Sequence, residues 1–365
     1  MKQLLITIFL LSLLFSCQQG ENSGEKTDNQ EVPSLILEGE KHFKNVRQLT
    51  FGGDNAEAYF SFDSQYLTLQ RTHPSENIPC DQIFMGKIPT SDEESFEMNL
   101  ISTGTGRTTC SYFMPGDDQI IFASTHQAGE ECPPEIDRAK VQKYVWPIYN
   151  SFELYISDLE GNIVTQLTNN DAYDAEATVS PTKDKIVFTS TRNGDLDLYT
   201  MDIDGSNVQQ ITNEIGYDGG AFFSPDGTKL LFRASRFQTE EEKTEYLDLL
   251  SQGMVAPTNM ELFICNVDGS DLKQITNLGK ANWAPFYHPS GKKIIFSSNH
   301  GSESGRSFNL YMINEDGSDL EQITIDAEFA SFPMFSYDGK KLVFAANRNN
   351  GGTRETNLFI ADWVD

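Results

Sequence analysis

Residues 186–212, IVFTSTRNGDLDLYTMDIDGSNVQQIT, contain the pattern that decides the fold. The apolar triplet Ile186-Val187-Phe188 is followed by the strand-like Leu198-Tyr199, and an Asp-Gly turn at residues 204–205 leads into Gln210-Ile211-Thr212. β-Branched and aromatic runs separated by tight-turn residues indicate short antiparallel strands. This stretch therefore predicts three consecutive strands of one sheet.

The pattern recurs along the chain. Each copy opens with a short aromatic segment and a Ser-Pro-Asp-Gly type turn, such as residues 224–227, before the triplet. The closing tripeptide stands at Gln48-Leu49-Thr50, Gln166-Leu167-Thr168, Gln210-Ile211-Thr212, Gln274-Ile275-Thr276 and Gln322-Ile323-Thr324, with Leu100-Ile101-Ser102 as a degenerate copy. Four short strands per repeat are typical of one propeller blade. The sequence predicts an all-β, six-bladed β-propeller of four-stranded antiparallel blades.

The first and last repeats are incomplete in complementary ways. Residues 357–365 supply a third strand that no closing tripeptide follows, whereas residues 44–50 form a fourth strand that no complete repeat precedes. We expect the N-terminal strand to complete the last blade. Such closure removes the exposed sheet edge that an open stack of hairpins would leave.

The repeated motifs carry a family resemblance. The Ser-Pro-Asp-Gly turn, the Leu-Tyr-x-Met-Asp strand at residues 198–202 and the Asp-Gly-Ser-Asn-x-x-Gln-Ile-Thr segment at residues 204–212 resemble the TolB-type, WD40-like (PD40) propeller repeat. Relatives of prolyl oligopeptidase use the same repeat. The resemblance covers residues 45–365 and implies a TolB-like propeller. TolB also has an N-terminal α/β domain, where this chain has only a short tether, and no hydrolase domain is recognisable here.

The N-terminal segment predicts export. Lys2 precedes an apolar run from Leu4 to Phe15, which is typical of a secretory signal. The run ends in Leu14-Phe15-Ser16-Cys17, which resembles a bacterial lipobox, so we expect residues 1–17 to be a lipoprotein signal peptide and Cys17 to be lipidated. An ordinary cleaved signal with a chance cysteine is the alternative. Residues 18–42 are predicted to be a flexible polar tether, and residues 43–365 the propeller.

The net charge of the chain disfavours two classes of partner and bears on its location in the cell. The net charge of −27 disfavours nucleic acid, whose phosphates require a basic surface. It also disfavours a basic membrane-binding face, so we expect membrane contact only through the N-terminal lipid. We predict a monomer that is lipid-anchored in the bacterial cell envelope, either periplasmic or at the outer membrane.

The long connections are predicted to share one face of the propeller. In an up-and-down blade, the second strand ends and the third begins on the same face, and only these connections are long. They are residues 72–81, 126–151, 236–260, 300–308 and 348–356. Long loops on one face of a scaffold typically build a binding surface. Within residues 236–260, Thr239 and Glu242 form a capping box for a helix that ends near Gly253, which we interpret as a lid or docking helix or as a packed decoration.

Polar residues cluster at one end of the predicted blades. The second strands end at His73, His126, Arg192, Arg236, His300 and Arg348, and the first-strand entries add Glu57, Asp174, Glu176, Asp218 and Asn282. These residues predict a polar or anionic ligand site at the channel mouth. His73, His126 and His300 are candidate ligands of a divalent metal, the only cofactor that the sequence suggests. The alternative is a structural ring of ion pairs in which the histidines occupy the same position.

The cysteines suggest an oxidising compartment. Cys80, Cys110 and Cys132 map to the long-loop face of the first two repeats, and an exported chain favours one disulfide among them. The spacing does not decide which two pair, and a Cys/His metal site is the alternative. Cys265 lies in a predicted third strand and is expected to be a buried thiol.

We therefore expect a non-enzymatic envelope lipoprotein whose long-loop face binds a protein partner or an envelope oligosaccharide. No Gly-x-Ser-x-Gly, His-Glu-x-x-His, Cys-x-x-Cys or Walker motif occurs. The alternative is enzymatic, because some TolB-type propellers resemble metal-dependent oligosaccharide lyases that act on uronates. In such an enzyme the three histidines would serve as metal ligands or base, and Arg192 and Arg236 would hold the substrate carboxylate.

Overall fold

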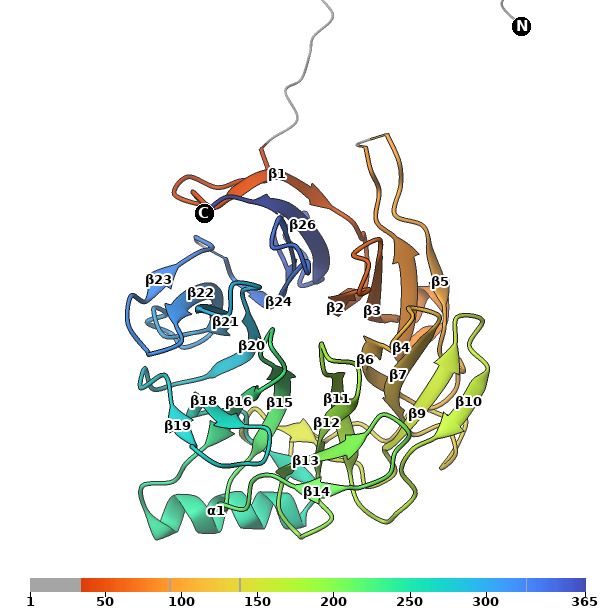
Figure 1. The fold of residues 1–365 in the computed structure, drawn as a ribbon, viewed down its shortest axis with the longest axis vertical. Coiled ribbons are helices and arrows are strands. Elements are labelled where there is room, and N and C mark those ends of the chain that lie inside the picture. The colour runs from red at the N-terminus through yellow and green to blue at the C-terminus, as the bar shows by residue number, and fades with distance from the viewer. Residues whose placement is uncertain (1–33, 92, 138, 326) are drawn as a thin grey trace, which may run out of the picture. The chain divides into compact units, whose positions relative to one another are not determined.

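The computed structural model describes residues 34–365 except 92, 138 and 326. Six four-stranded antiparallel sheets are arranged as blades around a common axis (Figure 1). The predicted six-bladed β-propeller is confirmed. The predicted signal peptide with Cys17, and residues 18–33 of the predicted tether, lie outside the described residues.

The first three blades follow the chain from the inner strand outward. Blade 1 contains β2 (Asp54–Phe60), β3 (Tyr66–His73), β4 (Ile78–Lys87) and β5 (Met98–Leu100), with the short helix η1 (Pro74–Glu76) between β3 and β4. Blade 2 contains β6 (Thr108–Phe113), β7 (Gln119–Ser124), β9 (Glu153–Asp158) and β10 (Ile163–Gln166). Blade 3 contains β11 (Asp174–Val179), β12 (Lys185–Ser190), β13 (Asp197–Asp202) and β14 (Gln209–Gln210).

The other three blades complete the circle. Blade 4 contains β15 (Asp218–Phe223), β16 (Lys229–Ser235), β18 (Met260–Asn266) and β19 (Lys273–Gln274). Blade 5 contains β20 (Asn282–Tyr287), β21 (Lys293–Ser298), β22 (Asn309–Asn314) and β23 (Glu321–Gln322). Blade 6 contains β24 (Ala330–Phe335), β25 (Lys341–Ala346), β26 (Asn357–Trp363) and, as its outer strand, β1 (Phe43–Gln48).

The pairing of β1 with β26 closes the ring as the sequence predicts. The two strands are antiparallel, with Phe43 opposite Trp363 and Gln48 opposite Phe359. In Figure 1, β1 lies along β26 although the two strands come from opposite ends of the chain. The last blade thereby obtains a fourth strand, and its third strand is not left as an open edge.

Residues 35–42 fold against blade 6. The compact unit begins at Leu35, so this part of the predicted tether belongs to the folded domain. Glu40 is almost fully buried, and its carboxylate accepts hydrogen bonds from Arg348 at 2.6 and 2.9 Å. The ring of His42 stacks on Trp363, with the ring centres 4.8 Å apart. Both contacts fasten the start of β1 to the last blade.

Two long loops contribute the remaining elements. The loop between β7 and β9 contains β8 (Trp146–Pro147), and the loop between β16 and β18 contains α1 (Glu240–Ser251) and β17 (Met254–Val255). Thr239 caps α1 with the predicted capping box, in which its hydroxyl accepts from the Glu242 amide. Among the described residues, no helix has the length and apolar character needed to cross a membrane.

Candidate functional site

The inner strand of every blade contains a β-bulge at the same position. The bulged residues have left-handed backbone angles, with φ between 46° and 59°, and the pairing with the second strand shifts register beside each one. They are Glu57, Cys110, Glu176, Gly220, Ala284 and Phe332. A bulge re-aims the side chain that it carries, and all six residues line one cavity of about 400 Å³. Because left-handed angles are costly for residues other than glycine, these positions suit a functional site.

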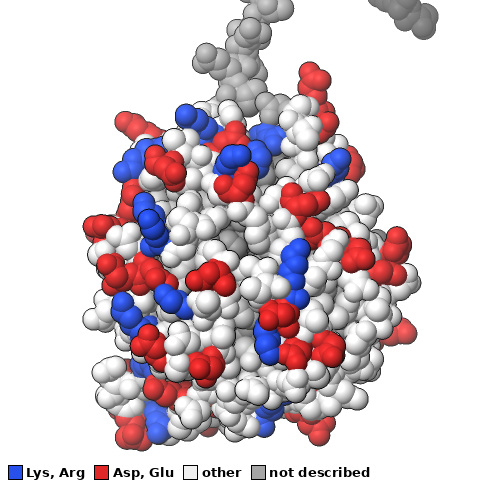
Figure 2. Space-filling view, viewed as in Figure 1, with Lys and Arg blue, Asp and Glu red and all other residues white. Residues whose placement is uncertain are grey.

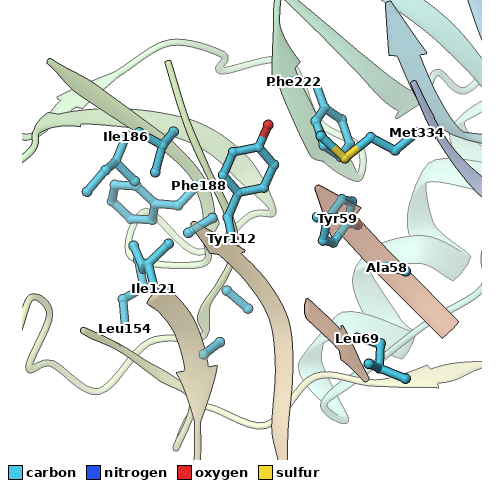
Figure 3. Close-up of a cluster of buried hydrophobic side chains, with 14 of the residues drawn as sticks. Ala58, Tyr59, Leu69, Tyr112, Ile121, Leu154, Ile186, Phe188, Phe222 and Met334 are labelled. Atoms are coloured by element: carbon cyan, nitrogen blue, oxygen red, sulfur yellow. The ribbon is translucent and has the colours of Figure 1, made fainter. Parts of the chain in front are cut away.

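A layer of mostly large side chains follows the bulges along the inner strands, and Tyr59, Thr178 and Phe222 of this layer line the cavity. Two positions after each bulge stand Tyr59, Tyr112, Thr178, Phe222, Phe286 and Met334. The ring of Tyr59 lies 5.6 Å from that of Tyr112 and 5.7 Å from that of Phe222. Figure 3 shows these three rings and Met334 meeting between the inner strands. The propeller axis is therefore filled below the bulges, and the cavity lies on the side of the long loops.

Trp146 forms part of the cavity wall from the loop side. Its ring stacks on Trp283 of blade 5 at 5.0 Å, and meets Tyr217 of blade 4 edge-on at 6.4 Å. The Arg233 guanidinium lies 5.6 Å from the same indole. A loop that starts in blade 2 thus reaches side chains of blades 4 and 5. Tyr144, Ile148, Tyr149 and Phe152 of this loop also line the cavity.

The two long loops are joined to each other, and we call residues 126–151 and 236–260 together the cap. Strand β8 pairs with β17, so that Trp146 lies opposite Val255, and the Ile148 amide donates to the Gly253 carbonyl at 2.7 Å. Lys143 pairs with Glu245 of α1, and the Tyr246 hydroxyl donates to Asp195 of blade 3. The helix is therefore part of a cross-linked cover.

A disulfide joins the cap to blade 1. Cys80 of β4 is bonded to Cys132, 52 residues later in the chain. Cys110 and Cys265 are thiols, and Cys265 is buried as expected. The structure thus pairs the first and third of the three candidate cysteines, a choice that their spacing left open.

Glu176 and Arg233 form a buried pair in the cavity wall. Arg233 donates to the Glu176 carboxylate and to the Tyr217 oxygen, and the Tyr217 hydroxyl donates to Glu176 at 2.7 Å. The Gly220 amide and the Thr189 hydroxyl donate to the other carboxylate oxygen. Burial opposes ionisation of Glu176, but Arg233 and these hydrogen bonds outweigh it and hold its pKa below the usual value. The two opposite charges thus compensate each other within the protein, and the buried Arg233 Nε is left without a hydrogen-bond partner.

Glu57 lies in a different environment. Burial raises its pKa to about 7; the Cys110 thiol opposes this rise, and the Glu176 charge adds to it. Among the described residues, Glu57 has no ion-pair partner, since Arg233 pairs with Glu176. Burial, together with Glu57 and Glu176, also raises the pKa of Cys110 well above its usual value, so this cysteine is a neutral thiol.

The strand-exit arginines are paired with acids outside the cavity. Arg192 donates to Asp174 at 2.9 and 3.0 Å, and its guanidinium lies 4.8 Å from the Tyr199 ring. Arg236 pairs in the same way with Asp218 and stacks on Phe263, while Arg348 pairs with Glu40. Asp174 and Asp218 are fully buried. Each pair fastens strands within one blade or joins the N-terminal segment to it.

The strand-exit histidines occupy the same position in blades whose inner strand has an uncharged residue two positions before the bulge. His126 contacts the Ser124 hydroxyl at 3.0 Å and packs on Tyr155, and burial lowers its pKa. His73 lies 3.3 Å from Glu76, and His300 contacts the Leu278 carbonyl at 3.1 Å. The first-strand residues of these blades are Asn55, Thr108 and Asn282.

The structure therefore separates the sequence candidates into two groups. Glu57 and Glu176 line the cavity. His73, His126, Arg192, Arg236, His300, Arg348, Asp174 and Asp218 do not, and each contacts partners of its own. No group of three His, Cys, Asp or Glu side chains suited to a metal ion exists in the part of the chain that is described. The three histidines do not fit a shared metal site.

The sequence reasoning missed the bulge as the common feature of the site. Each bulged residue stands two positions after the first-strand residue that faces the strand exit, as Glu176 does after Asp174. Cys110, Gly220, Ala284 and Phe332 occupy this position but share no chemistry. An alignment of the repeats could have shown that these six positions are equivalent. It could not have shown their positive φ, because the six residues share no residue type that marks a left-handed backbone.

The fold, the ring of bulges and the cap define the class: a six-bladed β-propeller with a covered cavity on its loop face. The model of the TolB β-propeller domain (PD40) matches residues 148–258. The structure of a putative TolB from Agrobacterium tumefaciens is similar, with a TM-score of 0.56 and 17% identity over 86% of this chain and 91% of that chain. The chain is a TolB-like six-bladed β-propeller.

Two structures of oligogalacturonate lyase are also similar in fold. One is a complex with manganese, with a TM-score of 0.50 and 14% identity over 87% of this chain and 80% of that one. The other is from Vibrio parahaemolyticus, with the same score and identity over 86% and 79%. Identities this low show the shared fold alone. No curated protein matches this chain.

Proposed function

We propose that this chain is a non-enzymatic binding protein of the bacterial cell envelope, and that its capped face binds a protein partner. The observation that carries the proposal is the cap itself, which a strand pair and a disulfide hold over an aromatic cavity. Aromatic side chains fixed in place are the usual anchors of protein interfaces. Tyr144, which is 54% exposed and accepts a hydrogen bond from Trp146, extends this aromatic surface outward.

Two features support a location in the envelope. The Cys80–Cys132 disulfide is of the kind that persists in oxidising compartments outside the cytoplasm. The signal-like residues 1–17 with Cys17 supply the means of export and, when lipidated, a membrane anchor. The propeller then works as a monomer beside the membrane, with membrane contact only through the lipid.

The enzymatic alternative has less support in the residues of this chain. The proposed lyase chemistry needs a metal site and free arginines, whereas the three histidines have separate partners and Arg192 and Arg236 are paired with aspartates. An envelope oligosaccharide is the second candidate ligand, because aromatic rings and polar groups also suit sugars. Either ligand would approach through the capped face.

Affinity capture with the full-length chain tests this proposal. The tagged wild-type protein, Tyr144→Ala and the control Val208→Ala are cross-linked in envelope extracts of the source cells, and the captured proteins are quantified by mass spectrometry. Val208 is 43% exposed but lies in the turn between β13 and β14, on the face opposite the cap. Loss of a central aromatic anchor costs about 2 kcal/mol or more, so Tyr144→Ala should reduce capture by roughly tenfold or more.

The capture experiment distinguishes three outcomes. A protein retained equally by wild type and Val208→Ala but lost by Tyr144→Ala supports the proposal. Equal capture by all three chains contradicts the assignment of the capped face. Specific retention of an envelope oligosaccharide, with no protein that distinguishes the variants, replaces the protein partner with the second candidate.

A further inference from the structure

Three carboxylates line the cavity, and two of them are satisfied. Glu176 pairs with Arg233 and accepts further hydrogen bonds. Asp81 accepts from the Thr72 hydroxyl at 2.6 Å and lies 3.7 Å from Arg107. Glu57 remains as the cavity carboxylate without a basic partner among the described residues. A carboxylate taken out of water normally requires a counter-charge or several donors.

The surroundings of Glu57 do not supply this counter-charge. The groups that act on it electrostatically are the Cys110 thiol, Glu176, Arg233 and Asp81. The first is neutral, two are negative, and Arg233 is already bonded to Glu176 and Tyr217. Glu57 lines the cavity and is only partly buried, so a ligand in the cavity can reach its side chain.

The remaining walls suit an organic cation. Aromatic rings from five blades and the cap line the same space as Glu57, among them Tyr59, Tyr173, Tyr217, Phe332 and Trp146. The faces of such rings attract cations. The chain as a whole carries a net charge of −27, which attracts a basic partner. Figure 2 shows acidic and basic side chains interspersed over the viewed face, with mostly uncharged surface around the centre of the ring.

We propose that this cavity binds the primary ammonium group of a basic peptide segment, with Glu57 as its counter-charge and the aromatic rings as its walls. The inference rests on the proposed function and specifies the chemistry of the partner. The ammonium group belongs either to a lysine side chain or to the amino terminus of the partner. An anionic ligand is disfavoured, because both arginines in the cavity wall, Arg107 and Arg233, are already paired with carboxylates.

Blocked tripeptides test this inference directly on the full-length protein. The probes are acetyl-Gly-Lys-Gly-amide, the same peptide with norleucine in place of lysine, and Gly-Gly-Gly-amide with a free amino terminus. Binding is measured by titration calorimetry and by the fluorescence of Trp146 and Trp283, which line the cavity. The protein variants are Glu57→Gln, which keeps the shape and removes the charge, and the control Glu93→Gln, an exposed carboxylate in the turn between β4 and β5.

We expect the lysine or the free-amine peptide to bind, the norleucine peptide to bind at least about tenfold more weakly, and Glu57→Gln to lose about 30-fold or more in affinity. The source of the ammonium group follows from which of the two amines binds. Equal affinity of wild type and Glu57→Gln, equal affinity for lysine and norleucine, or no binding of either amine overturns the inference.

Failure of this inference is distinguishable from failure of the proposed function. When neither amine binds but Tyr144→Ala still loses the captured protein, the capped face is a protein interface and Glu57 is not its ammonium site. When the amine binds and no protein distinguishes the Tyr144 variants, the cavity is an ammonium site without the proposed partner. The thermal stability of Glu57→Gln, measured in parallel, shows that the variant is folded.

Discussion

Replacement of Glu40 by glutamine is expected to destabilise the propeller strongly, because Glu40 holds the N-terminal segment to the closing blade. Its side chain is fully buried and accepts hydrogen bonds from Arg348, from the Leu37 amide at 2.9 Å and from the Ile325 amide at 3.2 Å. Glutamine removes the charge and turns an NH₂ group toward some of these donors. Breaking one partner of a buried ion pair costs about 3–5 kcal/mol.

The expected change in melting temperature follows from the size of the domain. With an unfolding entropy of about 2.1 cal/mol/K per residue, a domain of roughly 330 residues loses about 4–7 °C for this free energy. Calorimetry or circular dichroism of the variant measures the loss. The control Glu328→Gln, at an exposed carboxylate that accepts from Asn347 at 3.3 Å, should change the free energy of unfolding by less than about 0.5 kcal/mol.

A double variant separates charge burial from packing. Replacement of both partners by apolar residues, Glu40→Leu with Arg348→Met, removes the need for either charge. It should recover part of the stability, because the Leu37 and Ile325 amides still lose their acceptor. The reasoning is refuted when Glu40→Gln costs less than about 1 kcal/mol, the value of a surface ion pair. It is also refuted when the double variant is as unstable as the single one.

Two further substitutions test the cavity. Gly220→Ala would place a Cβ atom against the Arg233 guanidinium, at a backbone φ of +58°. We therefore expect displacement of Arg233 and a loss of about 3 kcal/mol in the free energy of unfolding, measured by chemical denaturation. The control Gly129→Ala, whose new Cβ meets no atom within 4 Å, should be nearly neutral. An equal effect of the two changes would contradict this. Glu57→Gln tests the raised pKa of Glu57, which rises from 4.5 to about 7 on burial. The protonated carboxyl stabilises the folded state fully below about pH 4.5, and this stabilisation is lost as the pH rises through 7. The variant should therefore match wild type near pH 4.5 and exceed it by at most ~3 kcal/mol at pH 8, and a difference independent of pH would contradict the assignment.

The sequence was sufficient to predict the fold, the closure and the helix of the cap. Short-range rules decide most of these features: Asp-Gly turns separate strands, and the Thr239 and Glu242 capping box begins α1. The closure follows because two strands with open edges, which pair at Arg47 and Ile360, complete each other. The candidate site was predicted only in part, because Glu57 and Glu176 are the predicted site residues that line the cavity. The roles of the other candidate residues depend on the direction of a side chain at the end of a strand, and the alignment of strands does not contain that information.

In blades 1 to 5, the residue at the end of the second strand is matched to the residue near the start of the first strand. This matching explains why the blades can differ at their centre. Where a second strand ends in arginine, a buried carboxylate pairs with it, as Asp174 does with Arg192. Where it ends in histidine, the residue two positions before the bulge is uncharged, as Thr108 is in the blade of His126. In blades 3 and 4 this matching fastens the start of the inner strand to the end of the second strand. The bulge two residues later is then held in place by the backbone, whatever side chain it carries. Glu57, Cys110 and Gly220 can therefore occupy equivalent positions in one ring, and the chemistry of the cavity can change at the bulges while the matched pairs keep the scaffold the same.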